Sequence, residues 1–204
     1  MTSEGSTRAA RKEKTRRALL DQALDLGTAR GFGAVSLREV TRGAGLVPTA
    51  FYRHFTSLDD LGLALVTEAA RTLRTTVREI ERAARPSAAV EILAGHVHQN
   101  PSLLGFLARE RHGGAPAVRH AIADETTLVV RDVTVTLSRA PQLREWSAED
   151  LDTAAALLVD LLLETVAALD ESTDARTTHL VTQRATRQLR LVLLGISGWR
   201  PRPD

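Results

Sequence analysis

The stretch of sequence that decides the fold runs from residue 36 to residue 55 and reads SLREVTRGAGLVPTAFYRHF. Ser36 and Glu39 have the spacing of a capping box, in which each side chain bonds a free backbone N–H at a helix start. A short helix is therefore predicted from Ser36 to about Ala44, just before a glycine whose backbone angles are free for a turn. Pro48 suits the first turn of a helix, because its missing N–H would be unpaired there. A second short helix is expected over residues 48–55.

Another helix precedes these two, over residues 8–30. Leucine and alanine recur there every three to four residues, and Gly31 follows at a position typical of helix ends. Two short helices joined by a tight turn behind a basic leader form a helix-turn-helix arrangement. In the second short helix, Phe51 and Phe55 are four residues apart and face inward, so the polar side chains face outward. The pattern indicates a DNA-binding domain over residues 1–56.

The positive charge of the chain is concentrated in this domain. The 204-residue chain has a formal net charge of +2, but residues 1–56 hold 10 Arg and Lys against 5 Asp and Glu, whereas residues 57–204 hold 17 against 20. Such asymmetry is typical of a domain that binds nucleic acid. The candidate DNA-contacting residues are Arg8, Arg11, Lys12, Lys14, Ser36, Arg38, Pro48, Thr49, Tyr52, Arg53 and His54. The alternatives are a solvated arm for the four leader residues, a core position for Tyr52, a surface charge at Arg53, and a helix-end partner at His54.

Composition and segment lengths exclude several classes of protein. The chain has no cysteine, which excludes disulfides, thiolate catalysis and cysteine-bound metals. Its longest apolar stretches, such as residues 154–159, are far shorter than the roughly 20 residues that cross a bilayer. No secretory signal is visible in the polar N-terminal segment. We therefore expect a cytoplasmic protein with no membrane span.

Neither catalysis nor metal binding is expected. His96 and His98 are two residues apart, so on a helix they point to different sides and would not hold one ion. A Ser/His/Asp set, a P-loop and a dinucleotide glycine motif are all missing from the sequence. The remaining alternative to a DNA-binding protein is an all-helical scaffold, which would have no use for the basic leader.

The rest of the chain has helical periodicity and few strand patterns, so the fold class is all-α. Residues 57–204 are expected to form the second domain. Its predicted helices cover residues 57–84, 88–99, 102–112, 116–140, 148–170 and 176–195.

Leu37-Arg38-Glu39-Val40, followed by the segment from Gly45 to Phe55, resembles the signature of TetR-type transcriptional regulators, whose third helix typically ends in Tyr-x-His-Phe. Val47 departs from it, because many members have a Ser or Thr cap there that contacts phosphate. Further segments resemble the subgroup that represses unsaturated fatty acid synthesis genes: residues 11–17, 48–55, 61–63, 100–101 and 109–111. The resemblance implies about nine helices, a homodimer, and a C-terminal ligand pocket whose occupation changes the separation of the two DNA-binding heads.

The resemblance makes a long-chain acyl-CoA or fatty acid the favoured effector, and the apolar stripes of the second domain are its candidate site. The alternative is a repressor of an efflux or catabolic operon that answers to another apolar small molecule. Arg109 and Arg111 flank Glu110 and are either an internal salt-bridge network or an anchor for a carboxylate or phosphate. The candidate ligand-binding residues are Leu73, Val77, Phe106, Leu107, Arg109, Val130, Val133, Leu137, Leu158 and Leu162.

The last two long helices offer more apolar surface than one protomer would cover. The residues concerned are Leu157, Leu161, Val166, Leu180, Leu189, Leu191 and Leu193. A two-fold four-helix interface would bury them, which predicts a homodimer. A symmetric dimer in turn predicts a near-palindromic double-stranded DNA operator.

Overall fold

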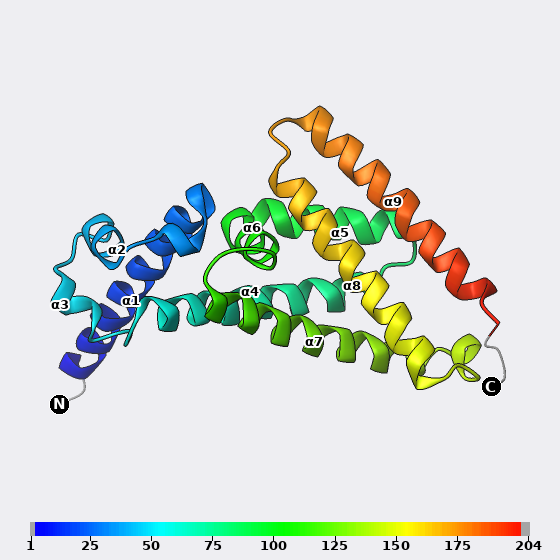
Figure 1. Cartoon of the computed structure of the whole chain (residues 1–204), viewed down its shortest axis with the longest axis horizontal. Helices are drawn as coiled ribbons and strands as arrows, with labels where there is room; N and C mark the ends of the chain where they lie inside the picture. The colour runs from blue at the N-terminus through cyan, green and yellow to red at the C-terminus, as the bar shows by residue number, and fades with distance from the viewer. Residues whose placement is uncertain (1–2, 201–204) are drawn as a thin grey trace.

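The computed structural model describes residues 3–200, with side chains from residue 8 onward. This part of the chain contains nine α-helices, two short 3₁₀ helices and no strand (Figure 1). The elements are α1 (Ser3–Arg30), η1 (Phe32–Ala34), α2 (Leu37–Gly43), α3 (Pro48–Phe51), α4 (Leu58–Ile80), α5 (Pro86–Gln99), α6 (Pro101–Glu110), α7 (Pro116–Ser138), η2 (Pro141–Leu143), α8 (Ala148–Asp170) and α9 (Ala175–Gly198). The predicted all-α fold class is confirmed.

The two short helices form where the caps and the turn predict them. The Ser36 backbone N–H donates to Glu39 Oε2 over 3.2 Å, and the Glu39 N–H donates to Ser36 Oγ over 3.4 Å, which completes the capping box of α2. Gly45 has φ +69°, a left-handed conformation that suits glycine. Pro48 is the first residue of α3. Val47 caps α3 without a side-chain hydrogen bond, in agreement with its departure from the family pattern.

The prediction that the second short helix extends to Phe55 is wrong. Helix α3 ends at Phe51, and residues 52–54 form a turn. The His54 N–H donates to the Phe51 carbonyl, three residues back, and the Arg53 N–H donates likewise to Ala50. These three-residue bonds tighten the chain into a turn, which a four-residue bond from the Phe55 N–H to the Phe51 carbonyl closes. The expected DNA-contacting residues therefore sit partly on a helix and partly on the turn after it.

Other helix ends differ from the predictions by a few residues. Helix α4 ends at Ile80 instead of residue 84, because Arg82 and Ala83 make three-residue backbone bonds that tighten the chain into a turn. Helices α5 and α6 begin one or two residues earlier than expected. In both, a proline takes the first helical position itself, where its fixed φ favours the helix.

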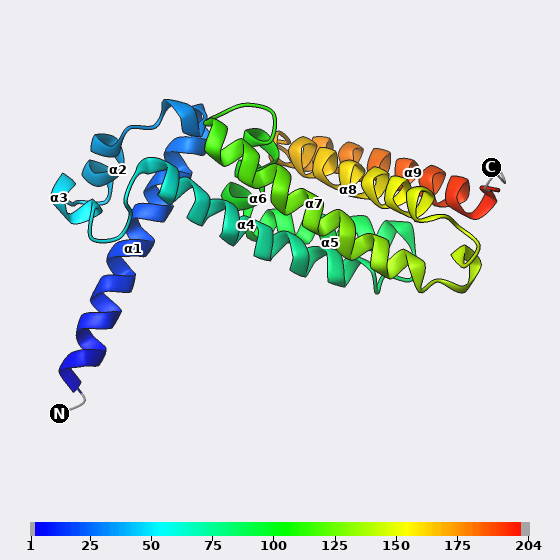
Figure 2. The ribbon, with the colours of Figure 1, turned by 60° about the horizontal axis from the view of Figure 1, so that its bottom comes forward.

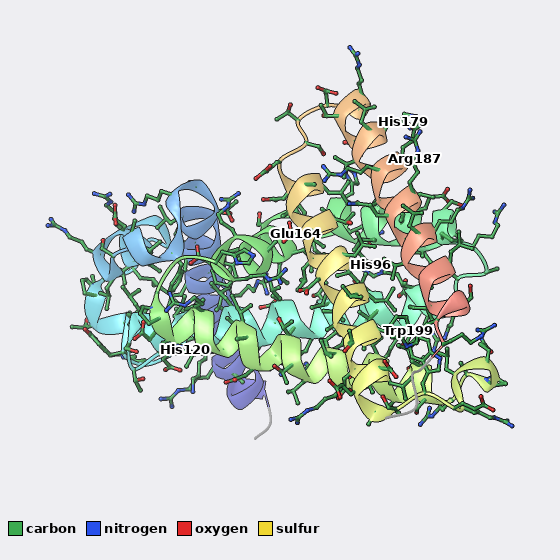
Figure 3. The ribbon with its side chains drawn as sticks, turned by 45° about the vertical axis from the view of Figure 1, so that its right-hand side comes forward. His96, His120, Glu164, His179, Arg187 and Trp199 are labelled. Atoms are coloured by element: carbon green, nitrogen blue, oxygen red, sulfur yellow. The ribbon has the colours of Figure 1, made fainter. Side chains whose placement is uncertain are left out.

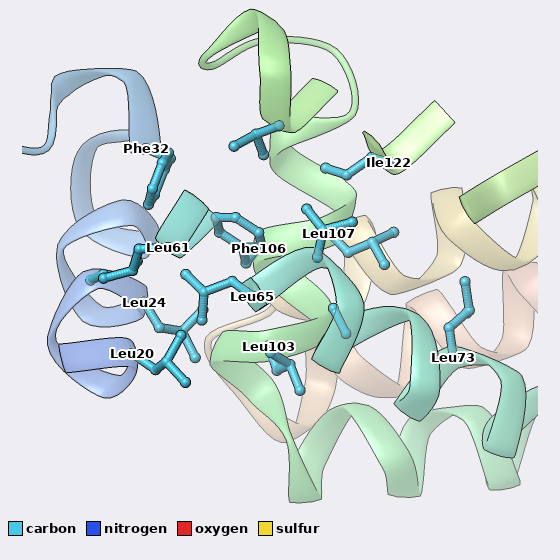
Figure 4. Close-up of a cluster of buried hydrophobic side chains, with 14 of the residues drawn as sticks. Leu20, Leu24, Phe32, Leu61, Leu65, Leu73, Leu103, Phe106, Leu107 and Ile122 are labelled. Carbon is cyan, nitrogen blue, oxygen red and sulfur yellow. The ribbon is translucent and has the colours of Figure 1, made fainter. Parts of the chain in front are cut away.

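The two halves of the molecule share one continuous core. Helices α1, α2 and α3 form a small unit at one end, and α4 runs from it into the C-terminal bundle, where α9 lies on α8 and α5 (Figures 1 and 2). Leu20 and Leu24 of α1 belong to the same buried cluster as Leu61 and Leu65 of α4 and Phe106 of α6 (Figure 4). Helix α4 therefore connects the two units mechanically.

Candidate nucleic-acid interface and ligand cavity

The turn after α3 presents polar side chains to solvent. Phe51 is fully buried and Phe55 nearly so, whereas Thr49 and Arg53 are exposed and Tyr52 is 63% exposed. The Tyr52 ring lies edge-on to the Phe51 ring, with 5.6 Å between centroids, so the core holds its base in place. Tyr52 is therefore not a core residue. Its outward position is compatible with the predicted DNA contact.

The start of α2 lies on a network of polar contacts. Ser36 Oγ donates to Glu39 Oε2 over 2.6 Å, and the Arg30 guanidinium lies 2.7 Å from the same carboxylate oxygen. Hydrogen bonds from Arg30 first, and then from Ser36, lower the pKa of Glu39 to about 2. The Ser36 hydroxyl is thus engaged in the cap, while Arg38 and Pro48 are exposed and outside this network.

His54 is half-buried, and its Nδ1 is enclosed without a hydrogen-bond partner among the described residues. Burial has the largest effect and lowers the pKa of His54, and the positive charges of Lys12 and Arg16 lower it further. The imidazole is therefore held neutral. A neutral ring would offer a DNA phosphate a hydrogen bond without a charge.

The leader residues Arg8, Arg11, Lys12 and Lys14 are exposed on the first turns of α1, which project beyond the body of the molecule (Figure 2). Arg8 and Lys12 share a face of the helix with Arg16, whose guanidinium lies 5.2 Å from the centre of the Phe55 ring. The basic face of α1 is therefore continuous with the turn after α3.

A cavity of about 360 Å³ lies in the C-terminal bundle, between the end of α4 and helices α5, α7, α8 and α9. Its lining is mostly aliphatic, with Glu81, Arg85 and Thr136 as further polar residues, and the buried Thr165 hydroxyl donates to the Leu161 carbonyl. Five of the predicted ligand-binding residues line this cavity: Val77, Val133, Leu137, Leu158 and Leu162.

The other five predicted ligand-binding residues lie elsewhere. Leu73, Phe106 and Leu107 are buried in the core that joins the two units, and Val130 packs against that core. The Arg109 guanidinium pairs with Asp170, with 3.0 Å between Nη2 and Oδ2. Arg109 is thus engaged in a salt bridge away from the cavity, which agrees with the internal salt-bridge alternative.

Sequence reasoning missed the contribution of α5 and α9 to the cavity. Ala89, Val90 and Leu93 line it from α5, and Ala185 and Leu189 from α9. Helical spacing marks these residues as an apolar face, but the same spacing marks every core helix, so no sequence signal separates cavity lining from packed core. The exposed Arg85, at the turn between α4 and α5, lies at the edge of the cavity.

Within the described side chains, no group of three His, Asp or Glu residues could hold a metal ion. His96 Nε2 lies 2.8 Å from the Glu79 carboxylate (His96 is labelled in Figure 3), whereas His98 is exposed. None of the described helices is both long and apolar enough to cross a membrane.

The described residues thus form a helix-turn-helix unit joined through one long helix to a bundle with an apolar cavity. Residues 19–65 match the sequence model of the bacterial regulatory proteins of the tetR family. This segment includes the C-terminal part of α1, the whole of α2 and α3, and the start of α4.

Solved structures of similar fold extend the likeness to the whole chain. A TetR-family transcriptional regulator from Streptomyces coelicolor has a TM-score of 0.65 and 23% identity, covering 91% of this chain and 97% of its own. FadR from Bacillus subtilis, solved in complex with stearoyl-CoA, has a TM-score of 0.65 and 14% identity, with 88% and 98% covered. The fatty acid degradation regulator FadR from Bacillus halodurans has a TM-score of 0.66 and 15% identity, with 92% and 97% covered. The chain therefore contains a segment that matches the tetR family model and shares its fold with these regulators.

Proposed function

We propose that this protein is a repressor that binds a near-palindromic operator as a homodimer and answers to a long-chain acyl-CoA or fatty acid. The observation that carries the proposal is the aliphatic cavity beside the C-terminal part of α4, the helix whose N-terminal part packs on the DNA-binding unit. A fatty acyl ligand is also supported by the two FadR structures of the same fold, one of which holds stearoyl-CoA.

The chemistry of the cavity suits an acyl chain. Each buried CH₂ group contributes roughly 0.8 kcal/mol, so a chain held by Leu158, Leu162 and Val133 would bind with few polar contacts. Leu93, Val159 and Ala185 are buried, whereas Ala84 and Arg85 are exposed at the edge of the cavity. We therefore orient the ligand with its chain inside and its anionic head near Arg85, in place of the Arg109 anchor.

The dimer is supported by the outer faces of α8 and α9. Leu157 on α8 and Leu180, Leu191 and Leu194 on α9 are all more than half exposed in the single chain. The three α9 leucines share one face of the helix, because positions 11 and 14 residues apart nearly coincide around it. A second copy covering these faces would form a four-helix interface. Of the other predicted interface residues, Val166 is buried within the protomer, and Leu161, Leu189 and Leu193 line the cavity.

Regulation would then follow from the two contacts of α4, one with the cavity and one with the DNA-binding unit. Val77 lines the cavity, and Leu61 and Leu65 pack against α1. An acyl chain packed against Val77 would tilt α4. This tilt would change the distance between the two turns that follow α3 in the dimer. The ligand can regulate only if it binds more tightly to the dimer at one separation of its two DNA-binding units than at the other.

The test uses an operator selected from random duplexes with the purified protein. Palmitoyl-CoA should change the operator affinity about 5- to 150-fold, the usual scale of coupling between two sites. Leu162→Arg should abolish this response and spare DNA binding, because it puts a charge in the cavity far from α3. Leu128→Arg, on the exposed face of α7, is the matched control and should respond like the wild type.

The alternative is a repressor that answers to another apolar small molecule. Its support is the cavity volume of about 360 Å³, near the lower end of the roughly 300–1,000 Å³ typical of ligand pockets. If palmitoyl-CoA neither binds in calorimetry nor changes operator affinity, the acyl-CoA proposal is wrong and this alternative stands.

A further inference from the structure

The triplet Arg109-Glu110-Arg111 at the end of α6 contacts both the cavity-lining bundle and the DNA-binding unit. Its two arginines pair with α8, and its glutamate reaches η1. The cavity is lined from α4, α5, α7, α8 and α9, and α6 stands outside that lining. Helix α6 is therefore placed between the two functional sites without belonging to either.

Glu110 makes the contact with the DNA-binding unit. Its side chain is 2% exposed, and Oε1 accepts a hydrogen bond of 2.8 Å from the backbone N–H of Phe32, the first residue of η1. Oε2 is buried without a hydrogen-bond partner among the described residues. A buried carboxylate with one neutral partner is unfavourable for stability. Its presence at this junction therefore calls for a role other than stabilisation.

The backbone around Glu110 is shaped to admit its carboxylate. Gly114 has φ +70°, and a Cβ at this position would overlap Glu110 Oε2. Gly31, with φ +85°, precedes Phe32 on the other side of the contact. The Phe32 and Phe106 rings meet edge-on beside it, 5.8 Å apart between centroids (Figure 4). The hydrogen bond thus sits in a close-packed junction between α6 and η1.

The two arginines make the contact with α8. Arg111 Nη2 lies 2.7 Å from Asp160 Oδ1, and Arg109 Nη2 lies 3.0 Å from Asp170 Oδ2. Gly105 brings the two helices together, because a Cβ there would overlap the Asp170 carboxylate. Asp160 adjoins Leu161 in the chain, and Leu161 lines the cavity. A movement of α8 at the cavity therefore carries the partner of Arg111 with it.

We propose that this triplet couples the cavity to the DNA-binding unit along a second route, from α8 through α6 to η1, parallel to the route along α4. Because Arg109 and Arg111 are paired with α8, a shift of α8 would move α6. Because Glu110 accepts the Phe32 N–H, a shift of α6 would in turn move η1. The inference rests on the proposed function for the ligand, but the contacts themselves predict how a disturbance of α8 spreads in the protein without ligand or DNA.

The first test needs neither ligand nor operator. Arg111→Asp breaks the pair with Asp160, and hydrogen exchange followed by mass spectrometry should then show faster exchange in the peptide around Phe32. The charge swap that adds Asp160→Arg should restore slow exchange there. The matched control is Asp152→Ala, which removes an α8 contact to Thr134 of α7 and should leave this peptide unchanged. Faster exchange confined to α6 and α8 in Arg111→Asp would overturn the proposal.

The second test measures coupling with palmitoyl-CoA and the selected operator. Glu110→Ala should reduce the effect of palmitoyl-CoA on operator affinity by about twofold to thirtyfold. Glu110→Gln, which keeps an oxygen for the Phe32 N–H, should retain most of it. An unreduced response in Glu110→Ala would overturn the second route. If palmitoyl-CoA does not change the operator affinity of the wild-type protein, the acyl-CoA effector is contradicted instead. The hydrogen-exchange experiment alone would then test the role of the triplet.

Discussion

Phe51 and Tyr52 are neighbours in the chain but lie in opposite environments. The Phe51 side chain fills the core of the DNA-binding unit, and the Tyr52 ring leans on it and projects into solvent. The same division separates Glu39 from Val40, one in the cap of α2 and the other fully buried. At the scale of the residue, the DNA-binding surface is therefore the set of side chains that the small core leaves outside.

The Glu39 carboxylate should make the free energy of unfolding decrease at low pH. Because Arg30 and Ser36 lower its pKa from 4.5 to about 2 in the folded protein, the unfolded chain binds a proton more readily. The stabilisation is complete above pH about 4.5 and is lost as the pH falls toward about 2. Urea unfolding at a series of pH values should show a shallower acid loss for Glu39→Gln than for the wild type. The same slope in both proteins would contradict the assignment, and Glu13→Gln, on an exposed part of α1, is the control.

Helix α3 is a four-residue element whose function extends into the turn that follows it. Its N-terminus has no side-chain cap, and its position depends on Phe51 and on the Pro48 start. The long α1 contributes a basic face beside this turn. The proposed DNA-binding surface is therefore a composite of α3, its turn and the first half of α1.

Replacing Tyr52 or Arg53 with Ala should weaken operator binding by roughly 1 to 3 kcal/mol and leave helicity unchanged, because both side chains are exposed. Gel-shift titrations measure the affinity and circular dichroism the helicity. Wild-type affinity in both variants would exclude this turn from the groove. The control is Arg144→Ala, an exposed arginine beyond α7.

The exposed cations at the start of α1 should contribute to operator affinity by binding DNA phosphates. Removing one such cation from its phosphate reduces the slope of log affinity against log salt by about 0.9. Neutralising four of them in each protomer of the dimer removes up to eight phosphate contacts and should therefore flatten the slope by up to about 7.2. The substitutions are Arg8→Gln, Arg11→Gln, Lys12→Gln and Lys14→Gln. An unchanged slope would show that these residues are only solvated.

In the whole molecule, one core joins the DNA-binding unit to the bundle, and the apolar faces of α8 and α9 remain open. The continuous core makes the two units move together within a protomer. The open faces leave room for a second copy. Symmetry between two protomers would then set the spacing of the two recognition turns.

Leu191→Glu combined with Leu194→Glu should convert the protein to a monomer, because two charges would have to be buried in the proposed interface. Analytical ultracentrifugation measures the mass. Operator affinity should fall by about 100-fold or more, since two linked half-site contacts become independent. Leu128→Glu, on α7, should stay dimeric. A double variant that keeps the dimer mass would place the interface elsewhere.

Local chemistry in the sequence was enough to predict the helix-turn-helix unit. The Ser36 and Glu39 cap, the Gly45 turn and the Pro48 start each act within four residues, so they are readable without tertiary contacts. The outward position of Tyr52 and Arg53 followed from the four-residue spacing of Phe51 and Phe55. The number of helices followed from periodicity and proline.

Only the tertiary structure decided which apolar faces surround a cavity and which fill the core. Val133 and Phe106 are both buried apolar residues on helices, yet the first lines the cavity and the second packs on Phe32. The partners of Arg109 and Glu110 lie 61 and 78 residues away in the chain. Periodicity tells which face of a helix is buried, but the neighbour of that face depends on how helices pack across the whole chain.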